Sequence, residues 1–277
     1  MTLADFDFEA GEVLLLDKPL TWSSFDVVRK VKNTLRIRKI GHAGTLDPLA
    51  TGLLILCTGK KTKQIDQIQA QEKEYTGTFR LGETTPSFDL ETAVDQTRPY
   101  AHLTDEQLLA ATQQFMGEIQ QTPPLFSAVK VDGQRAYELA RKGEQAEIKS
   151  KTVTIKAFEL TRIALPDVDF RVVCSKGTYI RSLARDLGEA LGCGAHLTAL
   201  VRTRIGNYAL SEAFSIDDVQ ALRPPAPASP AGPGSAAAAR PRRERLPRPR
   251  PGLDYYAAQH PAQPDPAADT PPSPAEK

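Results

Sequence analysis

The sequence has few cysteines, and their positions argue against two common ways of stabilising a fold. Cys57, Cys174 and Cys193 are odd in number and far apart, which suits neither a disulfide framework nor the paired spacing of a zinc site. We therefore expect reduced cysteine side chains in a protein of the cytoplasm, with no bound metal.

Long apolar runs are also missing. No stretch approaches the roughly 20 apolar residues that span a bilayer. The N-terminal segment Met-Thr-Leu-Ala-Asp-Phe-Asp is acidic, unlike a signal peptide. Both observations predict no membrane contact. Hydrophobic residues still make up 40% of the 277 residues, enough for one large domain or two small ones with a real core.

The net charge of +1 conceals an uneven distribution of basic residues. Six lie between residues 29 and 39 with no acidic residue among them, and Lys60, Lys61 and Lys63 follow. The second cluster, taken alone, is best explained as a solvated helix face. Because the two clusters flank one glycine-rich loop, we favour a polyanionic partner over two unrelated surfaces.

The predicted helices and strands indicate the fold class. Alternation of Tyr75, Gly77, Phe79 and Leu81 predicts a half-buried strand. A capping-box pattern at residues 104–107 predicts a helix whose buried face continues through Leu108, Ala111, Phe115 and Ile119. Other strands are expected at 12–16, 53–57, 153–160 and 168–174, and other helices after Ser24 as a cap, from Ala136 until Gly143, and from Ile180 onward. Without regular βαβ alternation, this order predicts an α+β fold with a largely antiparallel, mixed sheet flanked by helices.

Residues 223–277 differ in composition from the rest. Residues 224–277 hold 15 of the 22 prolines, and such a segment cannot bury enough apolar area to offset the cost of ordering its backbone. We expect a globular domain at 1–222 and a disordered Pro/Ala/Arg-rich tail at 223–277. The basic stretch 240–250 would suit weak RNA binding, whereas out-of-frame translation of GC-rich DNA would give the same composition.

The glycine-rich loop at residues 41–52 is the most distinctive local pattern. Its glycines permit backbone conformations closed to other residues, and Pro48 fixes the chain directly after Asp47. This pattern suits a rigid loop that holds a carboxylate. On local pattern alone, however, Asp47 is better explained as a turn residue before proline.

Other segments carry chemically useful side chains with equally simple explanations. His42 could be a loop histidine that bonds the backbone, Tyr75 a strand aromatic, and Arg181 a solvated helix residue. The segments that stand out are 17–19, 41–54, residue 75 with 80–82, 123–128 with Lys130, 175–188, 192–197 and 200–204.

Together and in this order, these segments resemble the TruB family of tRNA pseudouridine synthases. The resemblance covers roughly residues 11–222, and the loop at 41–52 is its most specific part. It implies the pseudouridine-synthase fold and the isomerisation of uridine 55 in the T-loop of tRNA, without metal or cofactor. The N-glycosidic bond would break, the uracil would rotate, and a bond from C5 would replace it.

The resemblance also implies roles for single residues. Asp47 would be the catalytic carboxylate, attacking either the ribose anomeric carbon or the uracil ring. Arg181 would pair with it, since a buried carboxylate tends to be protonated and a guanidinium can meet it with two parallel hydrogen bonds. Tyr75 would stack on the target uracil, Tyr179 would be a second aromatic of the pocket, and Leu200 would contact the base.

A base inside a folded T-loop must be flipped out before it can react. By the same resemblance, His42 would fill the vacated stacking space as a wedge and not as a proton carrier. Lys18, with Pro19, would support the Asp47 loop at the substrate site, and Lys130 would meet RNA. Residues 29–39 are the candidate contact stretch for tRNA phosphates.

One departure from the family concerns the C-terminus. Many members end in a PUA domain that touches the acceptor stem, and residues 224–277 cannot form one. A shortened variant and a frameshift would both explain this, and either affects acceptor-arm binding more than the chemistry. We expect a monomer that acts on the T-arm.

Three rival functions follow from the same residues. An RNA-guided, dyskerin-type relative is disfavoured by the short N-terminus and the absent PUA region. A tRNA-folding factor with incidental catalysis would share the same surfaces. A metal-dependent hydrolase using His42 and Asp47 lacks a third ligand at suitable spacing.

Overall fold

The computed structural model describes residues 3–127, 129–131, 133–141 and 148–222, without the side chains of 130, 131, 135, 140 and 141. One large sheet dominates it, in the strand order β1-β3-β12-β4-β11-β10-β7, with β2 on β3 and β13 on β12. Every pairing is antiparallel except β12 with β3. The predicted α+β class with a largely antiparallel, mixed sheet is confirmed.

The strands of this sheet are β1 (Val13–Lys18), β2 (Ile40–His42), β3 (Thr51–Thr58), β4 (Lys73–Leu81), β7 (Gly117–Gln121), β10 (Lys151–Ala164), β11 (Asp167–Cys174), β12 (Ala195–Ile205) and β13 (Tyr208–Ala209). Two small ribbons pair β5 (Glu83–Thr84) with β6 (Gln96–Thr97) and β8 (Lys130–Val131) with β9 (Gln134–Arg135). The helices are α1 (Ser24–Thr34), α2 (Ile65–Ala70), α3 (Asp105–Gln113), α4 (Ala136–Arg141), α5 (Ile180–Ala190) and α6 (Ile216–Ala221), with 3-10 turns η1 (Leu3–Asp5), η2 (Gly59–Gln64) and η3 (Leu210–Glu212).

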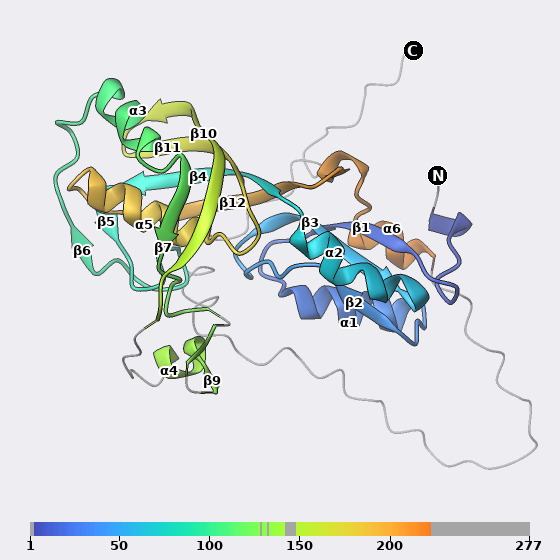
Figure 1. Ribbon diagram of the computed structural model, residues 1–277. Coiled ribbons are helices and arrows are strands. Elements are labelled where there is room, and N and C mark those ends of the chain that lie inside the picture. The colour runs from blue at the N-terminus through green and yellow to red at the C-terminus, as the bar shows by residue number, and fades with distance from the viewer. Residues whose placement is uncertain (1–2, 128, 132, 142–147, 223–277) are drawn as a thin grey trace, which may run out of the picture.

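The sheet has two parts that meet at β12. In Figure 1, β4, β7, β10 and β11 with α3 and α5 lie on the left, and β1 to β3 with α1, α2 and α6 lie on the right. Strand β12 pairs with β4 over nine residue pairs but with β3 over only two, Val201 with Thr51 and Arg202 with Gly52. The junction between the two parts is therefore narrow.

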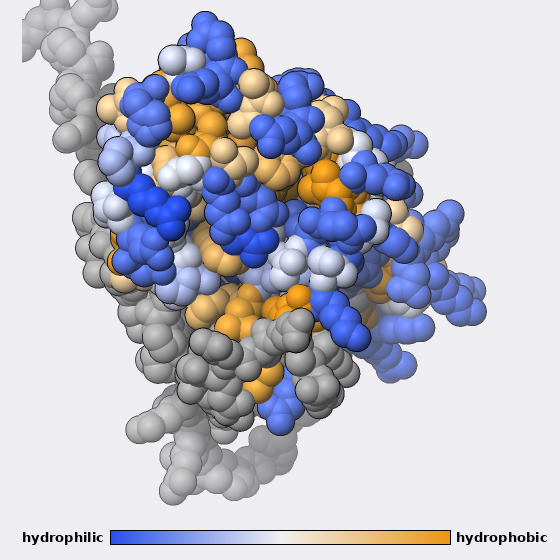
Figure 2. Space-filling model, turned by 60° about the vertical axis from the view of Figure 1, so that its left-hand side comes forward, coloured by the Kyte–Doolittle hydropathy of each residue, from blue (hydrophilic) through white to orange (hydrophobic). Residues whose placement is uncertain are grey.

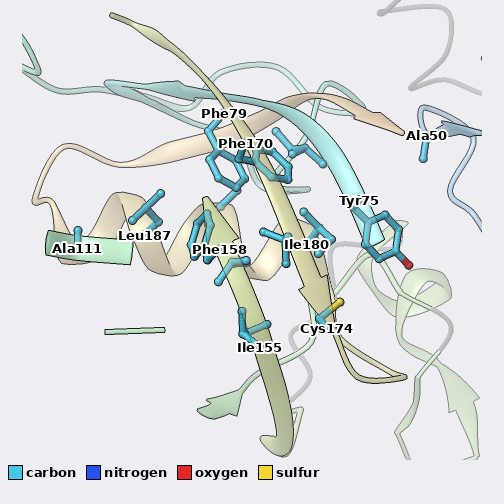
Figure 3. Close-up of a cluster of buried hydrophobic side chains, with 14 of the residues drawn as sticks. Ala50, Tyr75, Phe79, Ala111, Ile155, Phe158, Phe170, Cys174, Ile180 and Leu187 are labelled. Atoms are coloured by element: carbon cyan, nitrogen blue, oxygen red, sulfur yellow. The ribbon is translucent and has the colours of Figure 1, made fainter. Parts of the chain in front are cut away.

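Each part has its own hydrophobic core. On the left, α5 packs its apolar face onto β4, β10 and β11, where Phe79 and Phe170 stack with ring centroids 3.9 Å apart (Figure 3). On the right, α1 and α6 cover β1 and β3 around Leu14, Leu54 and Leu56. Burial of such side chains contributes about 1.5–3 kcal/mol each. The face seen in Figure 2 is mostly hydrophilic, with hydrophobic residues in separate patches.

The predicted elements are confirmed with small shifts and two corrections. Ser23, not Ser24, caps α1, because its hydroxyl accepts from the Asp26 amide in a capping box. Helix α3 ends at Gln113, and Ile119 lies on β7 because the chain turns through Gly117 at φ +82°. Helix α4 ends at Arg141, and the predicted stop at Gly143 lies outside the described residues.

Among the described residues, no helix has both the length and the apolar character that a membrane crossing requires.

Candidate active site

The glycine-rich loop connects β2 to β3, which pair as a hairpin that places His42 opposite Leu56. Its backbone is fixed from several directions. The hydroxyl of Ser24, freed from a capping role, accepts from the Leu46 amide at 2.8 Å and donates to the Leu46 carbonyl at 3.1 Å. The Thr21 amide donates to the Pro48 carbonyl at 2.9 Å. The loop is thus held on both sides of Asp47, as its sequence predicted.

Lys18 lies beneath this loop with no exposed surface. Its ammonium donates to the carbonyls of Trp22 at 2.6 Å, Pro19 at 2.9 Å and Pro48 at 3.3 Å. Burial lowers the pKa of Lys18 to about 8, against the opposing effect of the Asp47 charge. Lys18 therefore has the geometry of loop support and offers no surface to a substrate.

Arg181 places a buried cation against Asp47. The Arg181 Nη2 lies 2.8 Å from Asp47 Oδ2, and the exposed fractions of the two side chains are 4% and 44%. The reading of Arg181 as a solvated helix residue is wrong, because α5 turns it inward. Asp47, in contrast, was expected to be buried, but its carboxylate is half exposed. The buried member of the pair is therefore the cation.

Asp89 is a second carboxylate on the same guanidinium, and reasoning from the sequence did not identify it. Its Oδ2 lies 3.5 Å from Arg181 Nη1, and its side chain is only 7% exposed. Arg181 also donates to the carbonyls of Ser87 at 3.2 Å and Phe126 at 2.9 Å. Burial alone would lower the pKa of Arg181, but the charges of Asp47 and Asp89 outweigh it and raise the pKa. Arg181 is thus permanently charged and held in one orientation.

Burial also acts on Asp89 itself. It raises the pKa of the Asp89 carboxyl, while the Arg181 charge opposes that change. The three side chains form one chain of charges, in which Asp89 orients Arg181 and Arg181 orients Asp47.

Two tyrosines border the same space. Tyr75 on β4 is buried at one end of the left-hand core, and Figure 3 shows its hydroxyl directed away from the phenylalanine rings. Burial raises the pKa of Tyr75, and the nearby Arg202 charge partly opposes this. Tyr179 precedes α5, and its backbone is fixed by Gln121, which accepts from the Tyr179 amide at 2.8 Å and donates to its carbonyl at 3.1 Å. The Lys151 ammonium lies 4.5 Å from the centroid of the Tyr179 ring.

These residues line one cleft at the junction of the two parts of the sheet. Asp47, Tyr75, Tyr179, Arg181 and Leu200 all contribute to it, so the structure brings together five of the predicted site residues. Its volume is about 660 Å³, within the range of small-molecule sites and large enough for a nucleoside. Lys73, Lys151 and Lys176 add positive charge to its walls.

Three predicted residues do not appear among the described side chains of the cleft: Lys18, which lies beneath the Asp47 loop, His42 and Lys130. His42 is half-buried at the end of β2, and burial, aided by the Arg202 charge, lowers its pKa, so its imidazole is neutral at pH 7. Lys130 begins β8, and its side chain lies outside the described residues.

Arg202 is a site residue that residue-by-residue reading missed. It is 1% exposed and donates to three carbonyls around the Asp47 loop. Its only signal in the sequence was its place in the segment 200–204 that carries the family resemblance.

Comparison with known proteins gives this arrangement a family. Residues 32–180 match "TruB family pseudouridylate synthase (N terminal domain)", and residues 181–224 match "tRNA pseudouridylate synthase B C-terminal domain". The chain belongs to the TruB family. The two matched regions meet at the start of α5, which packs into the same core as β4 and β11.

Curated relatives of this TruB-family chain are similar over nearly their whole length. The tRNA pseudouridine synthase B of Flavobacterium johnsoniae is 58% identical over 217 residues, which cover 76% of this chain and 95% of the relative. That of Phocaeicola vulgatus is 57% identical over 217 residues, covering 76% and 92%. The match therefore covers nearly the whole of both relatives and about three quarters of this chain.

Solved structures with the same fold include Cbf5 proteins. The chain in a Cbf5-Nop10-Gar1 complex superimposes with a TM-score of 0.59 and 31% identity over 78% of this chain. The archaeal box H/ACA Nop10-Cbf5 complex gives 0.58 and 28% over 77%. This TruB-family chain spans only 60% and 54% of those two chains.

A basic hollow lies apart from the cleft. It is lined by Phe8, Glu9, Gly59 and the cations Arg38, Lys39, Lys60 and Lys63, so the two basic clusters of the sequence meet here. The 3-10 turn η2, which carries two of these lysines, continues into α2, whose Asp66 and Gln69 line the cleft. The hollow and the cleft are thus connected along the chain through η2 and α2.

The cysteines and potential metal ligands offer no further chemistry. Within the described ranges, no group of three or more His, Cys, Asp or Glu could hold a metal ion. All three cysteines are buried, and burial raises the pKa of Cys57 and of Cys174 to about 11, so neither is a reactive thiolate.

Proposed function

We propose that this TruB-family enzyme isomerises uridine 55 in the T-loop of tRNA to pseudouridine, with Asp47 as the catalytic carboxylate. One observation carries the proposal: a half-exposed carboxylate projects into a nucleoside-sized cleft, 2.8 Å from a buried arginine. Tyr75, Tyr179 and Leu200 supply aromatic and apolar surface around it. Family membership supports tRNA pseudouridylation in general, and the cleft geometry supports the residue roles.

The reaction needs a carboxylate close to a base that stays bound after it is detached. The bond from uracil N1 to ribose C1′ breaks, C5 bonds to C1′, the C5 proton leaves and N1 gains one. Asp47 attacks the ribose or the ring, while Arg181, 2.8 Å away, keeps it aimed, because positioning supplies much of the rate in such a site. Tyr75 stacks on the uracil, and Tyr179 and Leu200 confine it while it turns.

Access to the cleft requires the target base to leave its stack, at a cost of a few kcal/mol. His42 fills the vacated space as a wedge, a role that suits a neutral imidazole. Phosphates bind along residues 29–39 and the basic hollow, and Lys130 adds a contact, while Lys18 acts on RNA only through the Asp47 loop.

We further propose that residues 1–222 form the catalytic domain and act as a cytoplasmic monomer. Five of the proposed site residues from this range line one cleft, and the curated relatives align over 217 residues.

Among the rival functions, the RNA-guided one has the weakest support. Identity is 57–58% to the tRNA pseudouridine synthase B relatives but 28–31% to Cbf5 proteins, of which this chain spans little more than half. A tRNA-folding role is compatible with the enzyme, since both use the same surfaces.

An assay on unmodified tRNA transcript in EDTA tests the proposed function. We expect pseudouridine at position 55 without any guide RNA, detected by reverse-transcription stops after carbodiimide treatment, and none in a transcript with cytidine at that position. Absence of product from folded protein would defeat the enzyme proposal. Loss of product by EDTA alone would favour the metal-dependent rival.

The basic hollow predicts a second, separable effect. Replacing both Lys60 and Lys63 by Glu is expected to weaken tRNA binding by at least about tenfold and to flatten its salt dependence, because phosphate contacts release counterions. The single-turnover rate at saturating protein should stay within about twofold. Lys156→Glu, on exposed β10 and paired with Glu72 at 2.8 Å, is the control. If the Lys60/Lys63 double variant and Lys156→Glu bind tRNA with equal affinity, the basic hollow is not part of the binding surface.

A further inference from the structure

Arg202 lies where the two parts of the sheet meet. Its register partner is Gly52 of β3 on one side and Tyr75 of β4 on the other. In Figure 1, β12 runs between the left-hand part and the strands β1 and β3. Gly52 has φ +93°, and a Cβ there would lie 2.5 Å from the Arg202 carbonyl oxygen, so the two strands approach more closely than a side chain permits.

The Arg202 side chain crosses this junction into the Asp47 loop. Its Nε donates to the Leu53 carbonyl at 2.8 Å, one Nη to the Gly44 carbonyl at 3.1 Å and the other to the Thr45 carbonyl at 3.4 Å. Thr45 is only two residues before Asp47. A guanidinium suits this task because its N–H groups diverge in one rigid plane, whereas an ammonium is a single point of charge.

Two other supports of the loop backbone come from its own side of the junction. Ser24 begins α1 and Lys18 ends β1, and both belong to the part of the sheet that carries the loop. Arg202 instead sits on the strand that carries Leu200 and directly beside Tyr75. It therefore links Asp47 to the aromatic and apolar wall on the opposite side of the cleft.

We propose that Arg202 is a positioning residue that fixes the Asp47 loop relative to Tyr75 and Leu200, and so sets the gap in which the target base reacts. This rests on the proposed function. With the guanidinium fork removed, Asp47 keeps its carboxylate and its side-chain contact with Arg181, but the backbone of the loop loses its hydrogen bonds to β12. The basic surface that binds tRNA lies elsewhere and is unaffected.

The test compares Arg202→Lys with Arg204→Lys in single-turnover assays on unmodified tRNA. Arg204 lies two residues along the same strand, but its side chain is 29% exposed and pairs with Glu72 at 3.1 Å. We expect Arg202→Lys to lower the rate at saturating protein at least about 30-fold, since a misplacement of about 1 Å can cost 100-fold. Its tRNA dissociation constant should stay within about threefold, and Arg204→Lys should change neither.

Rates are expressed per tRNA-binding site, counted by stoichiometric titration, so that partial unfolding does not imitate a loss of positioning. A rate for Arg202→Lys within threefold of wild type overturns the proposal, as does a loss that appears only in tRNA affinity. If this variant does not fold, Arg202→Gln takes its place under the same criteria. A wild-type protein that makes no pseudouridine would instead defeat the proposed function, and this proposal with it.

Discussion

Asp47→Asn is expected to abolish pseudouridine formation while tRNA binding persists. The carboxamide has the same shape and can still accept a hydrogen bond from Arg181, 2.8 Å away in the native pair. It carries no charge and is a poor nucleophile, so removing the carboxylate should lower the single-turnover rate by at least about 10⁴-fold. The rate is measured at saturating protein, and tRNA binding by filter retention.

A matched control lies in the same cleft. Asp66 on α2 also contributes a carboxylate to its lining but does not belong to the Arg181 network. Asp66→Asn should leave the rate within about twofold of wild type. A near-normal rate for Asp47→Asn would show that the nucleophile has been assigned to the wrong residue.

Arg181→Lys is expected to have the second-largest effect, a loss of at least about 100-fold in the single-turnover rate. A lysine ammonium could approach Asp47, but it cannot also reach Asp89 and the carbonyls of Ser87 and Phe126 from one position. The native guanidinium contacts all four. The charge would therefore remain while the orientation of Asp47 would be lost.

Arg185→Lys is the control for this prediction. Arg185 lies one turn further along α5, is 22% exposed, and pairs with Asp186 at 2.6 Å. Both variants replace an arginine by lysine on the same helix. A difference between their single-turnover rates therefore reflects the contacts of Arg181 in the site and not a general effect on the helix. Equal rates for Arg181→Lys and Arg185→Lys would contradict the proposed role of Arg181.

The arrangement explains why a half-exposed carboxylate can serve as the centre of the site. The buried members of the network are Arg181 and Asp89, at 4% and 7% exposed, whereas the Asp47 side chain is 44% exposed. Asp47 stays open to the cleft, and its orientation comes from a cation that is itself fixed by Asp89 and two carbonyls. Removing Asp89 would therefore act on Asp47 through Arg181, without touching the substrate.

Local sequence patterns predicted most of the helices and strands, because the conformation of a helix, strand or turn depends largely on interactions between residues that are close in the sequence. The alternation at residues 75–81, the apolar run of β3 and the turn formers around Asp47 each describe how a few neighbouring residues must lie. The errors concerned the ends of elements. Either Ser23 or Ser24 could have capped α1, and Ser23 does. Helix α3 ends at Gln113 although the hydrophobic spacing continues to Ile119, because the chain turns at Gly117 into β7.

The sequence by itself determined the family, the α+β class and the loop that presents Asp47, since these depend on residue types in a fixed order. The family resemblance also implied that Arg181 pairs with Asp47, but only the tertiary structure decided the other partners of the buried arginines. Arg181 is bound by Asp89, 92 residues earlier in the chain, and Arg202 by Gly44, 158 residues earlier. No local pattern encodes such contacts, because they arise when separate strands pair in one register and bury the polar groups that must then find partners.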